Sequence, residues 1–286
     1  MHIARCPFPP LSSGPVLVLG TDDFASAVGH ALHRAGCAVL MARDATTPVL
    51  RRQMAFDPAL DLGETMLEGV IGRAAPDLLA IARLLIAGDA VPVTALPADD
   101  LLCMGLVRGV VDARMRRREA KADLRQLTGF SVGLGPGFVA GGNVDLAVET
   151  APEASGRILR QGATLAAHGR SEPLAGIGRE RFVRAADGGS WRSGRAIGEI
   201  VAAGEVVGRL AEATVTAPFP GALRGLVADG RAVRAGTKLL EVDPRGTAAQ
   251  VSGISPRAAS IARATVAAVR EAAAWHAARA ATPGLP

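Results

Sequence analysis

The chain opens with short apolar runs that alternate with an amphipathic stretch. Residues 16–19 form a continuous apolar run that ends at Gly20, a pattern typical of a buried strand. Asp23 is expected to cap the following helix, which repeats apolar residues at helical spacing and is closed by Gly36. A second apolar run, over residues 37–41, predicts the next buried strand. Strand, helix and strand in this order predict the start of a doubly wound α/β domain.

The same alternation continues toward the middle of the chain. Further apolar segments lie at residues 66–71, 78–87, 91–95, 101–106 and 107–111. Their lengths fit additional strands of one sheet and the helices that alternate with them. We therefore expect an N-terminal Rossmann-like domain with a parallel sheet over residues 1–126.

The second half of the chain has a different texture, with short β-branched runs punctuated by glycine. The run that starts at Ile200 is repeated in altered form from Leu226. Two hairpin units of this kind resemble the barrel-sandwich hybrid of biotinyl and lipoyl carrier domains, which we expect over residues 181–245. The sequence thus predicts an all-β domain over 127–250, followed by a C-terminal helix within 251–286.

Carrier domains of this kind hold their cofactor on a lysine between the two hairpin units. Here the connecting segment, residues 209–215, contains no lysine, and Lys121 and Lys238 are the only lysines of the chain. We therefore expect neither biotin nor lipoate on this protein.

The turn after the first strand is the place where dinucleotide-binding folds hold a pyrophosphate. Their fingerprint has a second glycine where the backbone approaches the phosphates, but this chain has Asp22 there, between Gly20 and Asp23. A carboxylate at that position opposes a phosphate both sterically and by charge. We take these three residues as candidate ligand contacts. An NAD(P)-dependent oxidoreductase stays an alternative, with Arg43 and Asp44 as ribose or phosphate contacts.

A second glycine-rich loop, with Gly133, Gly135 and Gly137, follows another predicted strand. Glycines leave backbone amides bare, which suits an anion, but the same pattern is typical of a tight turn that needs positive φ. Asp112 and Arg114 come at an earlier strand end, where they either hold an anionic ligand or form an internal ion pair. We expect these five residues to contribute to a site where the two domains meet.

Composition narrows the classes of partner. A formal net charge of +5 would favour nucleic acid, but aromatic residues make up 3% and tyrosine is absent, so platforms for base stacking are scarce. The longest mostly apolar stretch, residues 78–87, is too short to span a membrane. Cys6, Cys37 and Cys103 form neither a disulfide framework nor a metal-binding pair. We expect a cytoplasmic protein without a membrane or nucleic-acid partner.

Residue availability excludes several enzyme classes. A chain without tyrosine cannot supply the catalytic tyrosine of a short-chain dehydrogenase. The five histidines are dispersed, which argues against a metal hydrolase, and neither a nucleophile elbow nor a Walker loop is present. We therefore assign no catalytic residue and expect no metal site.

Eight features, in order along nearly the whole chain, carry a family resemblance. Three lie near its start: Gly20 followed by an Asp-containing turn, the string Leu32–Gly36, and Arg51–Arg52 before Phe56. The other five are strings further along. They are Asp112–Met115, Gly133–Phe138, Val148–Thr150, Ala217–Gly225 and Asp243–Arg245. Together they resemble the YqeB family, described as selenium-dependent molybdenum hydroxylase system proteins. The resemblance implies an accessory role in the maturation or cofactor supply of a molybdenum hydroxylase of the xanthine dehydrogenase class. It implies that enzyme or its maturation factors as partners, and molybdopterin or a nucleotide as the ligand.

The chain departs from the family pattern in its polar loops. The first turn lacks the Gly–x–Gly–Asp order, and residues 151–155 replace an Arg–Gly–His string. Because such loops contact ligands, a changed partner or a lost activity is one interpretation. A pure interaction protein without a ligand is therefore a further alternative, and an oligomer is compatible with the sequence.

Overall fold

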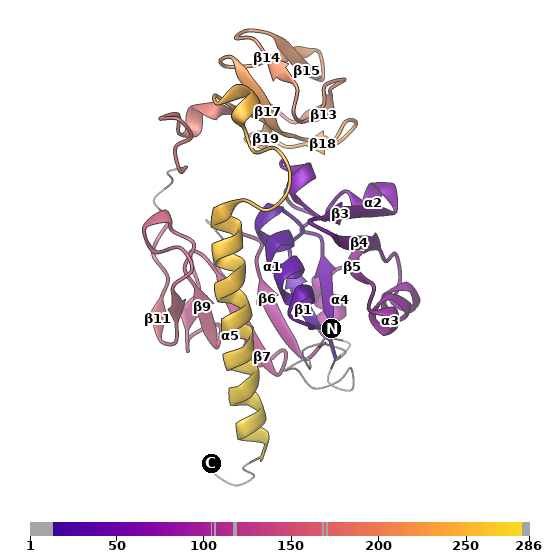
Figure 1. Ribbon diagram of the computed structural model, residues 1–286, viewed down its shortest axis with the longest axis vertical. Helices are drawn as coiled ribbons and strands as arrows, with labels where there is room; N and C mark the ends of the chain where they lie inside the picture. Colours follow the sequence, from indigo (N-terminus) through magenta and orange to yellow (C-terminus); the bar gives the residue numbers. More distant parts are fainter. Residues whose placement is uncertain are drawn as a thin grey trace.

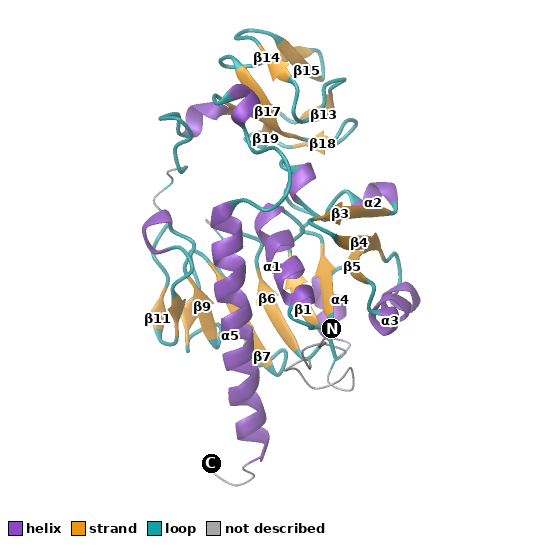
Figure 2. Ribbon diagram, viewed as in Figure 1, coloured by secondary structure: helices purple, strands orange, loops and turns teal. Residues whose placement is uncertain are grey.

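The computed structural model describes residues 14–281, except 104, 106, 117, 118, 168 and 170. The outermost residues of the expected first and last domains, Cys6 among them, lie outside the described part. Figures 1 and 2 show a mixed α/β body, a smaller β unit above it, and a long C-terminal helix that runs along the body. In the described part, no helix is both long and apolar enough to cross a membrane.

A nine-stranded sheet forms the body, with the strand order β10-β9-β7-β6-β1-β2-β5-β4-β3. All neighbouring pairs from β9 to β4 are parallel, whereas β10 and β3 are antiparallel edge strands. The strands are β1 Val16–Leu19, β2 Val39–Ala42, β3 Glu64–Leu67, β4 Val70–Ala74, β5 Ala90–Thr94, β6 Gly109–Asp112, β7 Phe130–Leu134, β9 Leu146–Val148 and β10 Ile158–Leu159. The large parallel sheet predicted from the alternating pattern is confirmed.

Helices cover both faces of this sheet. In β1, Val16 and Val18 enter one core with α1, α2 and α5, whereas Leu17 and Leu19 enter the opposite core with α3 and α4. Burial on both faces explains why the strands read as continuous apolar runs rather than alternating ones. The helices are α1 Asp23–Arg34, α2 Ala59–Leu62, α3 Leu78–Ala87, α4 Ala98–Cys103 and α5 Pro256–Ala281.

The sheet continues past residue 126, where the second domain was expected to begin. β7 pairs in parallel with β6, and β9 pairs in parallel with β7. Helix α5 packs against α1, β7 and β9. The boundary expected after residue 126 therefore falls within one packed body, because β7, β9 and the last helix complete the same core.

Above the body lies a β unit that spans residues 182–243, hereafter the β unit (Figure 1). Its two four-stranded sheets have the orders β12-β19-β17-β14 and β16-β15-β13-β18, with antiparallel pairs. They enclose a separate core around the fully buried Trp191, whose Nε1–H donates to the carbonyl of Val227 at 3.1 Å. The strands are β12 Phe182–Arg184, β13 Gly189–Arg192, β14 Ile200–Val201, β15 Val206–Leu210, β16 Ala213–Thr216, β17 Gly221–Leu226, β18 Ala232–Val233 and β19 Lys238–Asp243. The body also holds the small ribbon of β8 Val139–Ala140 and β11 Gly162–Ala163.

Helix α1 starts differently from the expectation. Asp22 is its cap, and Oδ1 of this residue accepts hydrogen bonds from the amides of Phe24 at 3.1 Å and Ala25 at 2.9 Å. The prediction that Asp23 is the cap was wrong, because the backbone of Asp22 is still extended while Asp23 already belongs to the first turn. The predicted end is confirmed, since Gly36 follows the helix with φ +83°.

Candidate functional site

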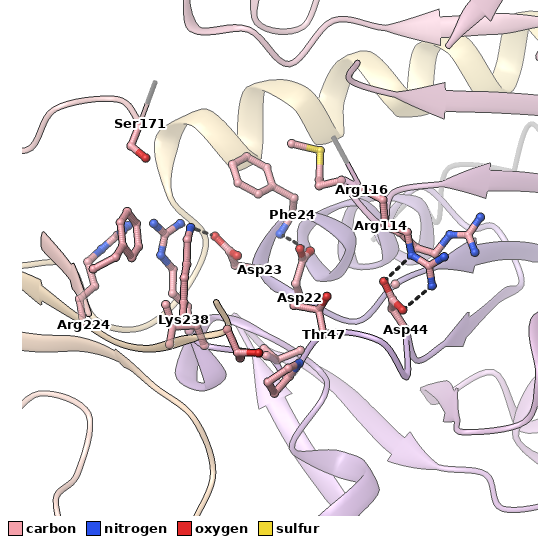
Figure 3. Close-up of a pocket in the computed structure, with 18 of the residues that line it drawn as sticks. Asp22, Asp23, Phe24, Asp44, Thr47, Arg114, Arg116, Ser171, Arg224 and Lys238 are labelled. Carbon is pink, nitrogen blue, oxygen red and sulfur yellow. Dashed lines mark hydrogen bonds and ion pairs between the residues drawn. The ribbon is translucent and has the colours of Figure 1, made fainter. Parts of the chain in front are cut away.

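A cleft of about 1360 Å³ lies between the carboxyl edge of the nine-stranded sheet and the β unit. Its sheet side is formed by the segments that follow β1, β2 and β6, and its other side by the β unit and the segment that precedes it (Figure 3). Open α/β sheets bind ligands at the carboxyl ends of their strands. Of the sequence candidates, the residues that line this cleft are Gly20, Asp22, Asp23, Asp44 and Arg114.

The turn after β1 is tightly packed. Gly20 has φ +110°, and a Cβ there would lie 3.1 Å from Cβ of Ala25 and 3.4 Å from Cα of Arg114. Only glycine fits this position without strain. The first amides of α1, which would bind an anion in a dinucleotide fold, already donate to the carboxylate of Asp22. The turn therefore presents a carboxylate to the cleft instead of bare amides.

Asp22 lies half-buried in the cleft wall. Its Oδ1 accepts both cap hydrogen bonds, whereas Oδ2 accepts none from the described residues. Burial and the neighbouring charge of Asp23 raise the pKa of Asp22 to about 7, although the cap hydrogen bonds and Arg51 lower it. At neutral pH this carboxyl group is therefore close to the midpoint of its titration and retains one oxygen for a donor.

Asp112 and Arg114 form the internal ion pair that was one of the two sequence interpretations. Asp112 is 1% exposed, and Arg114 donates to it from Nε at 3.0 Å and from Nη2 at 2.6 Å. The same local turn recurs at the end of β19, where Arg245 donates to Asp243 from Nε at 2.9 Å and from Nη2 at 2.5 Å. Both arginines line the cleft. The body and the β unit thus each present an arginine whose charge is matched by a carboxylate behind it.

The positions that would hold the ribose of NAD(P) are occupied by protein partners. Arg116 donates to Asp44 from Nε at 2.8 Å, and hydrogen bonds from Arg116 and Thr46 lower the pKa of Asp44 although burial raises it. Arg43 donates to Asp57 at 2.8 Å and 3.0 Å and does not line the cleft. Arg43 therefore does not face the cleft, and Asp44, which lines it, is already paired with Arg116, which weakens the oxidoreductase alternative.

A cluster around Glu241 was missed by the sequence analysis. Arg51 donates to the fully buried Glu241 from Nε at 2.7 Å and from Nη2 at 3.0 Å. Arg181 and Arg224 donate to Oε1 of the same carboxylate at 2.8 Å and 3.2 Å. Burial raises the pKa of Glu241, but the arginines lower it more, to about 2. Arg51 also lies 2.7 Å from Asp23, so the cluster joins the body to the β unit beside the cleft.

Two arginines on the side of the cleft formed by the β unit and the segment before it have no counter-ion among the described residues. Arg179 and Arg234 are exposed and line this side, and neither side chain makes an ion pair or hydrogen bond with the described residues. Nearby, Nη1 of Arg184 donates to the carbonyl of Gly236 at 2.6 Å. Such arginines are suited to bind phosphate or carboxylate groups.

The second glycine-rich loop does not line the cleft. A Cβ at Gly133 would lie 2.3 Å from the ring of Phe138, and one at Gly135, where φ is +83°, would lie 2.6 Å from Oγ1 of Thr150. The amide of Gly135 donates to the carbonyl of Val148 at 3.0 Å. Gly137 also has a positive φ, of +91°. The structure therefore places these glycines in the packing after β7, where Gly133 pairs with Asp112, and outside the lining of the cleft.

Metal-ligand chemistry finds no support in the described residues. Within them, no group of three or more His, Cys, Asp or Glu side chains is placed to hold a metal ion. Cys37 is buried and Cys103 is exposed.

Comparisons with known proteins give one substantial similarity. No protein-family model matches the chain. The chain is 33% identical over 249 residues to the uncharacterized protein YqeB of Escherichia coli (strain K12), a match that covers 86% of this chain and 45% of that protein. A product-bound structure of the ectoine utilization protein EutE (DoeB) from Ruegeria pomeroyi is 14% identical, with a TM-score of 0.24 and coverage of 80% of this chain and 85% of that chain. That structural likeness is too low to carry an argument. The chain spans less than half the length of its curated relative, and the similarity to that relative supports a YqeB-like family.

Proposed function

We propose that the cleft binds a phosphate-bearing ligand of nucleotide size. The observation that carries this proposal is the pair of arginines, Arg179 and Arg234, which line the cleft without a counter-ion among the described residues. Arginine binds phosphate oxygens through charge-assisted hydrogen bonds, and a volume of about 1360 Å³ admits a nucleotide or a larger conjugate. The position at the carboxyl edge of a parallel sheet supports the same conclusion.

We further propose that the protein is a cytoplasmic accessory factor for a molybdenum hydroxylase of the xanthine dehydrogenase class. Its role would be the maturation of that enzyme or the supply of its cofactor, with molybdopterin or a nucleotide form of it as the ligand. The family resemblance of the sequence supports this role. The two antiparallel sheets and the quasi-repeat at Ile200 and Leu226 support a barrel-sandwich hybrid as the fold of the β unit.

Two observations weigh against the alternative of an NAD(P)-dependent oxidoreductase. The backbone amides that would bind the pyrophosphate donate their hydrogen bonds to the carboxylate of Asp22 instead. Asp44, which follows β2, is paired with Arg116. A dinucleotide in the usual orientation would have to displace both interactions.

Native mass spectrometry of the protein purified from its own host tests the ligand proposal. We expect a phosphorylated small molecule to remain bound to the wild-type protein and to be lost from the double variant Arg179→Gln/Arg234→Gln. Arg83→Gln is the matched control, because Arg83 is an exposed arginine of α3 that does not line the cleft. Equal occupancy of the wild-type and double-variant proteins would overturn the proposed site.

A genetic complementation experiment tests the accessory role. In a strain that lacks this gene, we expect molybdenum hydroxylase activity to fall and to return with the wild-type or Arg83→Gln protein but not with the double cleft variant. The activity of an enzyme without molybdenum serves as the control for general effects. Full molybdenum hydroxylase activity in the strain that lacks the gene would contradict the role.

A further inference from the structure

We infer that the cleft holds its ligand in one orientation, with the phosphate against the β unit and an amino-bearing ring at Asp22. This inference rests on the phosphate-binding function proposed above and adds a second recognition group to that site. It reverses the orientation found in dinucleotide folds, in which the phosphate lies on the turn after the first strand.

The first step concerns where the phosphate goes. On the sheet side, Arg114 is paired with Asp112 and Arg116 with Asp44. On the β-unit side, Arg179 and Arg234 have no carboxylate partner in the described part of the chain. An anion gains most where positive charge is not already matched. The phosphate therefore lies on the β-unit side.

The second step excludes the turn after β1 as the phosphate site. The amides of Phe24 and Ala25 donate to Oδ1 of Asp22 and are not available to another anion. Asp23 adds a second carboxylate beside them, although it is paired with Arg51. A phosphate at this turn would meet carboxylate oxygens instead of donors.

The third step identifies what Asp22 binds. Oδ2 of Asp22 is an acceptor without a hydrogen-bond partner among the described residues, and Asp22 is one of the residues that line the cleft (Figure 3). Phe24 and Met115 supply apolar surface to the same cleft. A planar ring that packs there can donate one N–H from an amino group to Oδ2, which a ring with only acceptors cannot do. Burial and the neighbouring charge of Asp23 raise the pKa of Asp22, although its cap hydrogen bonds and Arg51 lower it.

Equilibrium binding to the wild-type protein tests the ring preference. The probes are two matched pairs, AMP with purine riboside 5′-monophosphate and GMP with IMP, in which one member of each pair lacks the exocyclic amino group. We expect the amino-bearing member of at least one pair to bind about tenfold more tightly. The corresponding nucleoside, which lacks the phosphate, is expected to lose at least about tenfold in affinity.

Two variants and their matched controls locate the contacts. Asp22→Asn keeps an N-cap but replaces the free oxygen by an amide donor. The preference for the nucleotide with the exocyclic amino group should therefore vanish in this variant. Asp77→Asn makes the same change at the cap of α3, outside the cleft, and should retain it. Arg234→Gln should reduce the advantage of the nucleotide over the nucleoside, whereas Arg83→Gln should not.

The outcomes separate this inference from the proposed function. Nucleotides that bind through their phosphates, with no discrimination within either pair or with discrimination that persists in Asp22→Asn, would overturn the orientation and leave phosphate binding intact. A protein that binds none of the four nucleotides at millimolar concentration would overturn both proposals.

Discussion

Arg51 and Glu241 are 190 positions apart in the chain, yet Nε of Arg51 lies 2.7 Å from Oε2 of Glu241. Arg51 follows β2 of the nine-stranded sheet, and Glu241 belongs to β19 of the β unit. Because Glu241 is fully buried, water cannot replace this pairing. The two units that form the cleft are therefore joined by a charge pair beside it.

Glu241→Gln is expected to destabilise the protein by about 3–5 kcal/mol, because it leaves buried arginines without their carboxylate. The free energy of unfolding, measured by denaturant titration, checks this. Glu212→Gln is the control. The Glu212 side chain is fully exposed, and its one ion pair, with Arg209 at 3.6 Å, is in solvent and contributes little to stability. Because the pKa of Glu241 is lowered to about 2, wild-type stability should also fall as the pH drops from about 4.5 toward 2. Equal stability of Glu241→Gln and Glu212→Gln would contradict the importance of the cluster.

Asp22 should give the stability a second pH dependence, of opposite sign. Its pKa is raised from 3.8 to about 7, so the folded state takes up a proton that the unfolded state does not hold between these values. Stability should therefore decrease as the pH rises from about 4 through 7. Asp22→Asn should remove this decrease and raise stability at pH 8 by about 1–3 kcal/mol. Unfolding titrations at several pH values test the slope, with Asp77→Asn as the control that should keep it.

Arg114→Ala is expected to weaken the fold as well as the cleft. The change leaves Asp112 buried without its partner, which should cost about 3–5 kcal/mol of stability. The double variant Asp112→Asn/Arg114→Gln removes both charges and should recover part of that loss. Thermal and denaturant unfolding of both variants provide the measurement. A wild-type stability in Arg114→Ala would mean that the ion pair contributes nothing to the fold.

Gly135→Ala should affect stability without changing ligand retention. Its Cβ would lie 2.6 Å from Oγ1 of Thr150, and φ is +83°, so steric strain and backbone strain add. We expect a loss of about 1–3 kcal/mol. Gly141→Ala, with φ +75° and no neighbour within 4 Å of its Cβ, isolates the backbone part and should cost less. If the Gly135→Ala protein is still folded but has lost its ligand, this loop contributes to ligand binding and the prediction is wrong.

The intact mass of the purified protein should equal the mass of its sequence, because neither biotin nor lipoate is expected. The hairpin between β15 and β16 turns at Ala211 and Glu212, without a lysine. Lys238 lies in β19, with Nζ 3.8 Å from the ring centroid of Phe182. Denaturing mass spectrometry checks this, and an added biotinyl or lipoyl group would show that the hairpin argument is wrong.

Local patterns in the sequence predicted several elements and the mixed α/β class of the fold. The apolar run over residues 16–19 predicted β1, and helical spacing closed by Gly36 predicted α1, because burial and turn geometry act between near neighbours. The alternation of such segments predicted the parallel sheet, and the short runs after residue 180 predicted antiparallel β structure. The cap was the exception, since Asp22 and Asp23 are adjacent residues of the same type and only the backbone conformation distinguishes them.

Only the tertiary structure decided how the cleft is built. Arg51 meets Glu241, and Arg179 and Arg234 stay without a carboxylate in the described part, because of how the β unit packs on the body. No spacing rule links such distant residues, since their contact depends on two separately folded cores. The same reason explains why Gly135, although glycine-rich loops bind anions elsewhere, serves packing here. Its neighbour Thr150 is brought to it by the pairing of β7 with β9, which the sequence around the loop does not encode.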